Sequence, residues 1–310
     1  MCNINSPFFI DEAEARKYLE AQRWPNGAVC PHCGGDERIY PIKANKDAKV
    51  REGLYQCNDC DKTFTVTVGT VFEGSKVPLH KWLMATYMMC SSKKGVSSKQ
   101  LERSLGVSYK TAWFMSHRIR EAMREENGGL LGGSGKTVEV DETFIGRDKN
   151  IKPKGMKKGR GYHHKQKVLS IVERGGKVRS NHVPSVKAST LKPILNEQIA
   201  KGSQVYTDEA GQYTQTREPM FEKHEFVSHG IGEYVRGDIH TNTIEGYFSI
   251  FKRGMKGIYQ HCGEQHLKRY LCEYDFRYNY REKLGFDDMA RTQIALQGIE
   301  GKRVLYRSPN

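Results

Sequence analysis

The sequence lacks any long hydrophobic run. No stretch approaches about 18 consecutive apolar residues, so we expect no membrane-spanning helix and no membrane partner. Residues 1–20 are acidic and contain no hydrophobic signal-peptide core. These two absences exclude membrane-spanning and secreted classes as readings of the sequence, and we expect a protein that stays inside the cell.

The sequence contains fewer acidic residues than basic ones. The 310 residues include 36 Asp and Glu against 50 Lys and Arg, which gives a formal net charge of +14. This surplus favours a polyanionic partner, either nucleic acid or an anionic membrane surface. A ribosome-associated or merely basic protein would have the same charge sum. The hydrophobic fraction of 37% is low but not that of a disordered chain, and the length suggests two or three compact units.

Cysteines are few, and only four of the eight are paired by their spacing. Cys30 and Cys33 form one CxxC motif, and Cys57 and Cys60 form a second. Two such tight turns together supply the four sulfurs of a tetrahedral Zn²⁺ site, and cysteines in a reducing compartment are more typical of metal sites than of disulfides. His32 is a competing ligand, and a redox role for one motif is the alternative. We therefore expect a zinc ribbon with a structural Zn²⁺. Its expected strands are 38–42, 54–56 and 62–68.

A helical module is predicted after the ribbon. Pro78 opens one helix, residues 97–105 form a second, and Ser108 caps a third that runs to about Met123. Two helices joined by a short turn at Gly106 are typical of a helix-turn-helix. The alternative is an ordinary three-helix packing unit with basic solvent-facing residues. The side chains of the third helix that we expect to contact DNA are Lys110, Thr111, Phe114, His117 and Arg118.

A basic segment follows a glycine-rich stretch that marks a domain boundary. Between residues 146 and 167, nine Lys and Arg residues stand against one acid, Asp148. Solvated charge is the usual explanation of a lysine run, but this imbalance favours a loop that follows a phosphate backbone. The candidate DNA contacts in it are Lys154, Lys157, Lys158 and Arg160.

Three acids fall on elements of a predicted mixed sheet. Asp141 lies in an alternating strand, Asp208 ends a short strand, and Glu245 lies at the edge of the apolar stripe of a helix. Lys252 follows Glu245 by two helical turns and points the same way. For any single acid, a solvated charge or a helix cap is the alternative. The expected elements are strands 137–145, 166–173, 177–184 and 203–207, and helices 191–200 and 243–255.

These motifs together resemble bacterial insertion-sequence transposases that carry an N-terminal zinc ribbon and a DDE catalytic domain, relatives of the eukaryotic Merlin transposases. The resemblance covers nearly the whole chain and implies an RNase H-like fold for about residues 136–285. The motifs that carry it are CPHC and CNDC, KKGVSSKQLERSLGVSYKTAW with HRIREAM, VEVDETFIG, YTDE, HTNTIEGYFSIFKRG and HLKRYLCEYDFRYNYR.

The resemblance implies that Asp141, Asp208 and Glu245 hold two Mg²⁺ or Mn²⁺ ions. Asp208 and Glu245 are separated by 36 residues, as in Merlin-type relatives. Asn242, one turn before Glu245, is an auxiliary or alternative third ligand, because a carboxylate suits Mg²⁺ better than an amide. Lys252 and Arg253 are expected to hold DNA.

The implied reaction is metal-dependent hydrolysis at the ends of the element, followed by attack of the freed 3′-hydroxyl on target DNA. The implied partners are double-stranded DNA, including terminal inverted repeats and target, and further copies of the chain in a dimer or larger oligomer. The implied location is the prokaryotic cytoplasm, at the nucleoid. The alternatives are a non-enzymatic DNA-binding protein and an RNase H-like nuclease or Holliday-junction enzyme.

The expected architecture is multi-domain, with a small β ribbon, an α-helical module and an RNase H-like α/β domain with a mixed sheet. The expected segments are an N-terminal helical lead-in (1–24), the zinc ribbon (25–72), the helix-turn-helix module (76–127), a glycine-rich linker (128–136), the catalytic domain (137–285) and a C-terminal tail (286–310).

Overall fold

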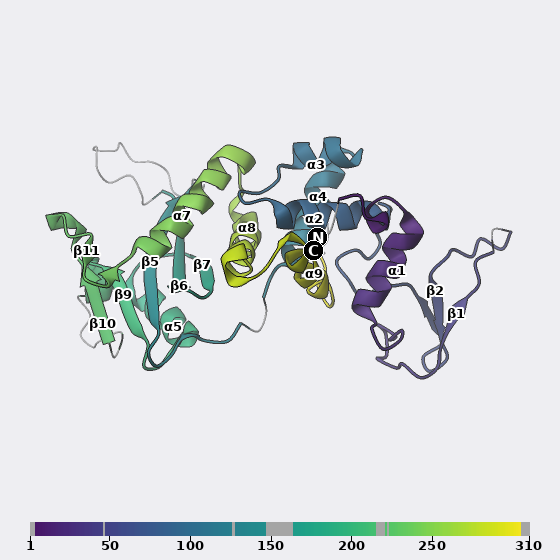
Figure 1. Cartoon of the computed structure of the whole chain (residues 1–310), viewed down its shortest axis with the longest axis horizontal. Helices are drawn as coiled ribbons and strands as arrows, with labels where there is room; N and C mark the ends of the chain where they lie inside the picture. Colours follow the sequence, from purple (N-terminus) through teal and green to yellow (C-terminus); the bar gives the residue numbers. More distant parts are fainter. Residues whose placement is uncertain are drawn as a thin grey trace. The chain divides into compact units, whose positions relative to one another are not determined.

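The computed structural model describes residues 4–45, 47–125, 128–146, 164–214, 221 and 223–304. The chain divides into two compact units, which Figure 1 shows coloured along the sequence. Unit 1 contains residues 1–124 and 282–310, and unit 2 contains residues 125–281. Among the described helices, none combines the length and the hydropathy that crossing a membrane requires.

A three-stranded antiparallel sheet forms the ribbon part of unit 1. Its order is β1 (Ile39–Ile42), β2 (Leu54–Cys57), β3 (Lys62–Phe64). Trp24, directly after α1 (Glu12–Arg23), is buried and meets the rings of Tyr55 and Phe64 edge-on, with centroids 5.5 and 5.7 Å away. The third strand is shorter than the predicted 62–68, because the backbone N–H of Val68 turns back to the carbonyl of Thr65.

Three helices follow the ribbon within unit 1: α2 (Leu79–Ser91), α3 (Ser98–Leu105) and α4 (Tyr109–Ala122). Ser108 caps α4 with its hydroxyl, as predicted, and Ser97 caps α3 in the same way. Gly106 ends α3 at a φ of +60°, a conformation that costs glycine little. The helix–glycine turn–helix pattern of the sequence therefore folds as three helices at the expected places.

The C-terminal segment corrects the expectation of a tail over residues 286–310. Residues 288–297 form helix α9, which packs on α2 in unit 1. Leu296 and Ile299 are buried, and the carbonyl of Ile299 accepts a hydrogen bond from the backbone N–H of Val71 at 3.0 Å. The prediction was wrong for residues 288–304 because the apolar residues of this segment complete a core that the N-terminal half of the chain begins.

Unit 2 contains a mixed sheet, as the sequence predicts, and this sheet has five strands (Figure 1). The strand order is β10-β9-β5-β6-β7. The three strands β5, β6 and β7 are antiparallel, whereas β9 is parallel to β5, and β10 is parallel to β9. The strand bounds are β5 (Thr137–Ile145), β6 (Gln166–Glu173), β7 (Val178–Val183), β9 (Gln204–Asp208) and β10 (Lys223–Val227), of which β10 was not predicted.

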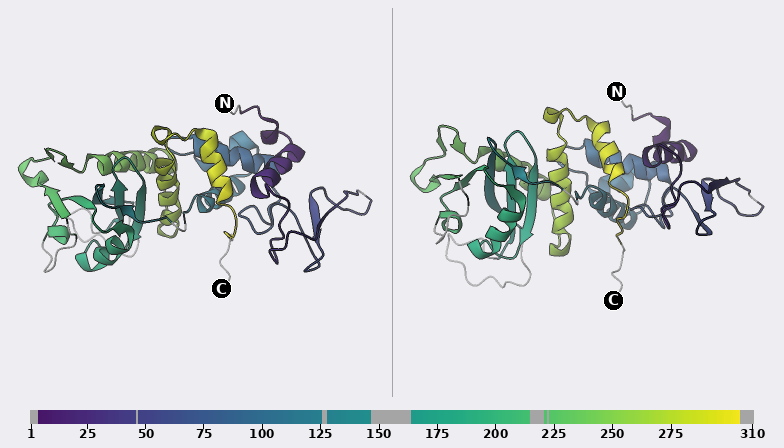
Figure 2. Two further views of the ribbon diagram at one scale, coloured as in Figure 1. Left: turned by 60° about the horizontal axis from the view of Figure 1, so that its bottom comes forward. Right: turned by 90° about the horizontal axis from the view of Figure 1, so that it is seen from below.

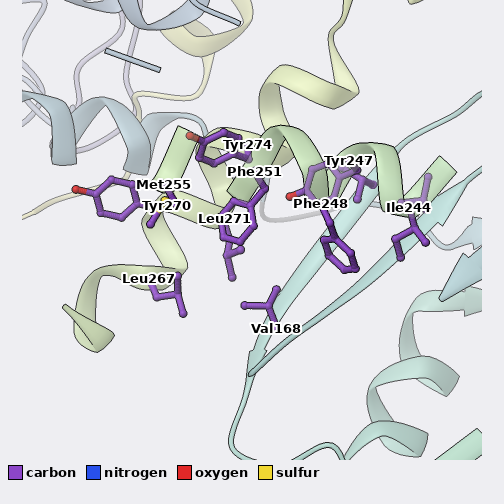
Figure 3. Close-up of a cluster of buried hydrophobic side chains, with 12 residues drawn as sticks. Val168, Ile244, Tyr247, Phe248, Phe251, Met255, Leu267, Tyr270, Leu271 and Tyr274 are labelled. Atoms are coloured by element: carbon purple, nitrogen blue, oxygen red, sulfur yellow. The ribbon is translucent and has the colours of Figure 1, made fainter. Parts of the chain in front are cut away.

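Helices cover both faces of this sheet (Figure 2). Helix α5 (Ala188–Gln198) buries Leu191 and Leu195 against one face, which includes Val138 and Val140. Helices α7 (Asn242–Gly254) and α8 (Glu264–Asn279) cover the other face. Figure 3 shows the side chains of these two helices gathered against Val168 of β6. Alternate residues of β5 therefore point toward α5 and toward α7.

The remaining elements are short. They are 3₁₀-helices at Pro7–Phe9, His229–Ile231 and Glu282–Leu284, the π-helical turn Met255–Tyr259, α6 (Gly211–Thr214), and the strands β4 (Leu131–Gly132), β8 (Ile199–Ala200), β11 (Val235–Arg236) and β12 (Ile239–His240).

The glycine-rich segment 128–136 is part of unit 2 rather than a free linker. Strand β4 pairs with β8, and Leu131 is buried in the core beneath α5. The backbone N–H of Gly132 donates to Glu173, and that of Gly133 donates to Ser203, each at 2.8 Å. A Cβ on Gly132 would lie 2.2 Å from the hydroxyl of Ser203, so close packing explains this glycine.

Asp275 joins α8 to the edge strand β7. Its carboxylate accepts hydrogen bonds from the backbone N–H of Ser180 at 2.8 Å, from the Ser180 hydroxyl at 2.7 Å and from the hydroxyl of Tyr247. Burial raises the pKa of Asp275 to about 6, although these donors pull the pKa the other way.

This raised pKa predicts a pH-dependent stability of unit 2. Between about pH 4 and pH 6 the folded state binds more protons than the unfolded state, so the free energy of unfolding falls as pH rises. A shift from 3.8 to about 6 corresponds to roughly 3 kcal/mol. The Asp275→Asn variant should therefore gain about this much stability relative to wild type between acidic and neutral pH, measured by urea unfolding followed by circular dichroism.

The neighbouring hydroxyls can rotate to accept from the new amide, so the variant should keep the fold. Asp238→Asn, at an exposed acid of the same unit, is the matched control. A stability difference for Asp275→Asn that does not change with pH would contradict the prediction.

Candidate functional site

The four paired cysteines converge on one point of the ribbon. The Sγ atoms of Cys30 and Cys60 are 3.7 Å apart, and those of Cys33 and Cys57 are 3.6 Å apart. A tetrahedral Zn²⁺ with Zn–S bonds of about 2.3 Å places its sulfurs about 3.8 Å apart, so these thiols have the spacing of a zinc site. His32 is exposed and does not belong to the cluster.

Backbone hydrogen bonds favour the thiolate form of Cys30, which is the form that binds a metal. Burial opposes the charged form of Cys30, but the backbone N–H groups of His32 and Cys33 hydrogen-bond to its sulfur and bring its pKa down to about 7. In the first turn, the backbone N–H of Cys30 also donates to the carbonyl of Gly35 at 2.9 Å. The donor set of four thiols, one of them readily ionised, fits Zn²⁺.

Strand register brings Asp141 and Asp208 together. In the parallel pair of β5 and β9, Val138 lies opposite Val205 and Glu139 lies opposite Tyr206. Continuing this register by two residues places Asp141 level with Asp208 on the neighbouring strand. Val138 and Val140 point into the core beneath α5, so Asp141 points toward the face that carries α7.

Glu245 reaches the same face from helix α7. Ile244 and Phe248 are buried against the sheet (Figure 3). Glu245 is exposed and directly follows Ile244, at the edge of that apolar stripe, as the helical spacing predicts. The hydroxyl of Thr241 donates to its carboxylate at 3.3 Å. Asn242 is exposed at the first position of the same helix. The structure thus presents both candidates for the third ligand at the first turn of α7.

The electrostatics of these acids are mutually unfavourable. Burial raises the pKa of Asp141 to about 8, and the negative charges of Asp208, Glu142 and Glu245 add to that rise. Burial also raises the pKa of Asp208. Carboxylate oxygens that repel one another in a half-buried site are relieved by a hard divalent cation, so this donor set fits Mg²⁺ or Mn²⁺.

The acids are more widely spaced than the thiols. Within the described part of the chain, only the four cysteines bring three or more ligand atoms within 4.8 Å of one another. The three carboxylates come from two strands and a helix and do not form so tight a cluster in this structure.

Lys252 lies in the field of these acids. Its side chain is half-buried, with the ammonium 5.8 Å from the ring centroid of Phe248. Burial lowers the pKa of Lys252, whereas the negative charges of Asp141 and Glu245 act in the opposite direction. Arg253 is exposed on the next position of α7. Lys252 therefore lies close enough to Asp141 and Glu245 for their charges to act on it.

Two further acids, Glu139 and Glu142, were not predicted as functional. They flank Asp141 on β5 and point to opposite faces of the sheet. Glu142 accepts hydrogen bonds from the hydroxyl of Tyr213 and from Gln212 at 3.1 Å, both on the short helix α6 that follows Asp208. Burial raises the pKa of Glu142 to about 7. Both acids are close to Asp141 in the sequence, but their hydrogen-bond partners are distant in the chain, so no local pattern identifies them.

Helix α4 supports only part of the predicted DNA surface. Lys110 is exposed, and Thr111 and Phe114 are half-buried. His117 and Arg118 are 1% and 9% exposed, and Arg118 donates to the carbonyl of Glu73 at 3.0 Å. The expectation that these two side chains contact DNA is therefore corrected, because both are enclosed by their surroundings in the structure.

The candidate DNA contacts of the basic loop, Lys154, Lys157, Lys158 and Arg160, lie outside the described residues. The described ends of this segment are Gly146 and residues 164–167, and Lys165 lies near enough to Lys252 for their charges to interact.

Comparison with known proteins places both sites in one family. The family model described as a transposase zinc-ribbon domain matches residues 10–63, and that described as an ISXO2-like transposase domain matches residues 130–279. An uncharacterized protein in the transposable element ISH50 of Halobacterium salinarum is 33% identical over 264 residues, which cover 79% of this chain and 83% of that protein.

A solved chain from the Mos1 strand transfer complex is 15% identical and covers 65% of this chain and 70% of that chain, with a TM-score of 0.27. At that score the likeness carries no argument about fold or function. The family matches have more weight, because they enclose the cysteine cluster and the acidic site separately and in the expected order. Together with the relative that spans most of its length, they show that the chain belongs to the insertion-sequence transposases with a zinc ribbon and an ISXO2-like DDE domain.

Proposed function

We propose that this chain is an active DNA transposase that cleaves the ends of its element and joins the freed 3′-hydroxyl to target DNA. The observation that carries the proposal is the convergence of Asp141, Asp208 and Glu245 on one face of the sheet. The family membership supports it, because the same residues lie inside the match to the DDE domain. We assign unit 2 an RNase H-like fold, a proposal that its mixed sheet with helices on both faces supports.

Asp141, Asp208 and Glu245 would hold two divalent cations, Mg²⁺ or Mn²⁺. When bound, such ions activate the attacking oxygen and stabilise the leaving oxygen of a phosphodiester. Asn242 is close enough in the helix to serve as an auxiliary ligand or to replace Glu245. Lys252, half-buried beside Asp141, would hold the phosphate at the reacting bond through its ammonium group. Arg253, exposed at the next position, would contact a neighbouring part of the DNA backbone.

Unit 1 would bind the terminal inverted repeats. The N-terminal end of α4, with exposed Lys110 and half-buried Thr111 and Phe114, would enter the major groove as a recognition helix. Zn²⁺ held by the four cysteines would have a structural role there. The basic residues Lys154, Lys157, Lys158 and Arg160 would follow the DNA backbone. Since two element ends must be joined, we propose a dimer or larger assembly on double-stranded DNA.

The central test of this proposal is the Asp141→Asn variant. It removes one negative ligand but keeps the size of the side chain, so DNA binding should persist while cleavage and strand transfer fall. A bound metal ion supplies several kcal/mol of transition-state stabilisation, so we expect a loss on the order of 10³-fold. The measurement is cleavage and joining of terminal-repeat DNA in Mg²⁺, with Asp238→Asn as the control variant.

The outcome of that assay distinguishes the competing functions. Full activity of Asp141→Asn would show that the metal assignment is wrong. A wild-type protein that binds the repeats but cuts nothing in Mg²⁺ or Mn²⁺ would be a DNA-binding protein, and one that cuts without joining would be a nuclease.

The zinc assignment predicts one Zn²⁺ per chain, measured by elemental mass spectrometry. Cys57→Ser removes one of four ligands, so its zinc content and the thermal stability of unit 1 should both fall. Cys262→Ser alters a half-buried cysteine of unit 2 outside the cluster and should leave zinc content unchanged. Equal zinc content in the two variants would count against the site.

The DNA surface of α4 predicts a salt-dependent contact at Lys110. The Lys110→Ala variant should bind repeat DNA more weakly, and the slope of log K against log salt should fall by about 1, because one phosphate contact is lost. The measurement is a salt titration by fluorescence anisotropy. Lys17→Ala, at an exposed lysine of α1 paired with Glu14, is the control. An unchanged slope for Lys110→Ala would place the DNA surface elsewhere.

A further inference from the structure

We propose that Glu139 is a positioning residue that sets Glu245 opposite Asp141 by holding the first turn of α7 against β5. This inference rests on the proposed function, since it assigns Glu139 a task in the same metal site. It concerns an acid that no family resemblance or sequence pattern singled out.

Glu139 is the buried partner of the start of α7. It is 0% exposed and points to the same face of β5 as Asp141, which lies two residues further along. One carboxylate oxygen accepts from the hydroxyl of Thr243 at 2.8 Å, and the other accepts from the backbone N–H of Ile244 at 2.9 Å. These donors immediately precede Glu245. The carboxylate thus satisfies an N–H of the helix start and lies where the helix dipole favours negative charge.

Arg174 extends this attachment to the segment before α7. Its Nε donates to Glu139 at 2.6 Å, and its other guanidinium nitrogens donate to the carbonyls of Asp238 and His240 at 2.7 and 2.9 Å. The guanidinium also lies 4.8 Å from the ring centroid of Tyr206, the residue that faces Glu139 in the neighbouring strand. The start of α7 is therefore tied to the sheet through its first turn and through the residues that lead into it.

The apolar face of α7 does not explain this network. Ile244, Phe248 and Phe251 already attach the helix to the sheet, and apolar packing is non-directional. A buried ion pair is weak evidence for stability, because apolar residues of similar volume often replace one without loss. Directional hydrogen bonds at the helix start instead fix where Glu245 lies along β5. Both oxygens of Glu139 are occupied by these donors, so it acts behind the metal ligands rather than as one of them.

The Glu139→Gln variant tests this role. A glutamine keeps the size of the side chain but offers one acceptor oxygen and an NH₂ group that faces donors, so it cannot serve both Arg174 and Ile244. Residues behind metal ligands typically contribute about 10–100-fold to metal affinity or activity, so the Mn²⁺ concentration for half-saturation should rise by about that factor. It is measured twice, by electron paramagnetic resonance of free Mn²⁺ without DNA and by DNA cleavage. Amide hydrogen exchange at Ile244 and its neighbours should become faster.

Glu173→Gln is the matched control. Glu173 lies in the same unit and pairs with Lys136 at 2.9 Å, but it holds Gly132 rather than an element that carries a catalytic acid. It should change neither Mn²⁺ binding nor exchange in α7. If Glu139→Gln does not fold, the pair Thr243→Val and Thr243→Ser decides: valine removes one donor at constant shape and should weaken Mn²⁺ binding, and serine should restore it.

A folded Glu139→Gln protein with wild-type Mn²⁺ binding and wild-type exchange in α7 would overturn the inference. So would equal Mn²⁺ binding by the valine and serine variants of Thr243. A wild-type protein that binds Mn²⁺ but cuts no DNA would overturn the proposed function alone, because Mn²⁺ binding and amide exchange are read without DNA.

Discussion

The burial of two neighbouring carboxylates, Asp141 and Asp208, is the main electrostatic constraint in unit 2. The parallel register of β5 and β9 holds two carboxylates level with each other at one side of the sheet, and Glu245 adds a third from α7. Burial and then the negative charge of Asp208 raise the pKa of Asp141, and burial raises the pKa of Asp208. A chain that only needed to fold would not place these charges together, so the arrangement has a cost that a functional site explains.

The rest of the unit offsets that cost from both faces of the sheet. Apolar side chains of α5 pack beneath β5 and β6, and those of α7 and α8 pack above them, so the backbone around Asp141 has little room to relax. The acids on either side of Asp141 then attach the elements that carry its partners. Glu142 reaches the short helix after Asp208, and Glu139 reaches the start of the helix that bears Glu245. One strand thereby organises all three carboxylates.

Sequence reasoning succeeded where the signal is local. The cysteine spacing predicted the ribbon cluster, alternation predicted β5, and helical spacing predicted α7 with Glu245 and Lys252 at its edge, because each pattern lies within one element. It could not identify β10, whose residues Lys223–Val227 are mostly exposed and show no buried alternation. It missed α9 and the enclosure of Arg118, because α9 packs on α2 and Arg118 donates to the carbonyl of Glu73, and both partners are distant in the chain. The strand register that brings Asp141 level with Asp208 likewise has no local signal.

The net charge of +14 attracts DNA, whereas the acidic site repels it. A DNA phosphate is repelled by three clustered carboxylates, so basic surfaces alone would bind DNA away from the reacting centre. Lys252 addresses this at short range: it is half-buried beside Asp141, and the like charges of Lys256 and Lys165 lie close enough to oppose its protonated form. A bound phosphate would reduce the repulsion among the lysines, and bound divalent cations would reduce the repulsion among the acids. Binding of DNA and of metal ions should therefore strengthen each other at this site, a coupling that neither charge cluster would produce by itself.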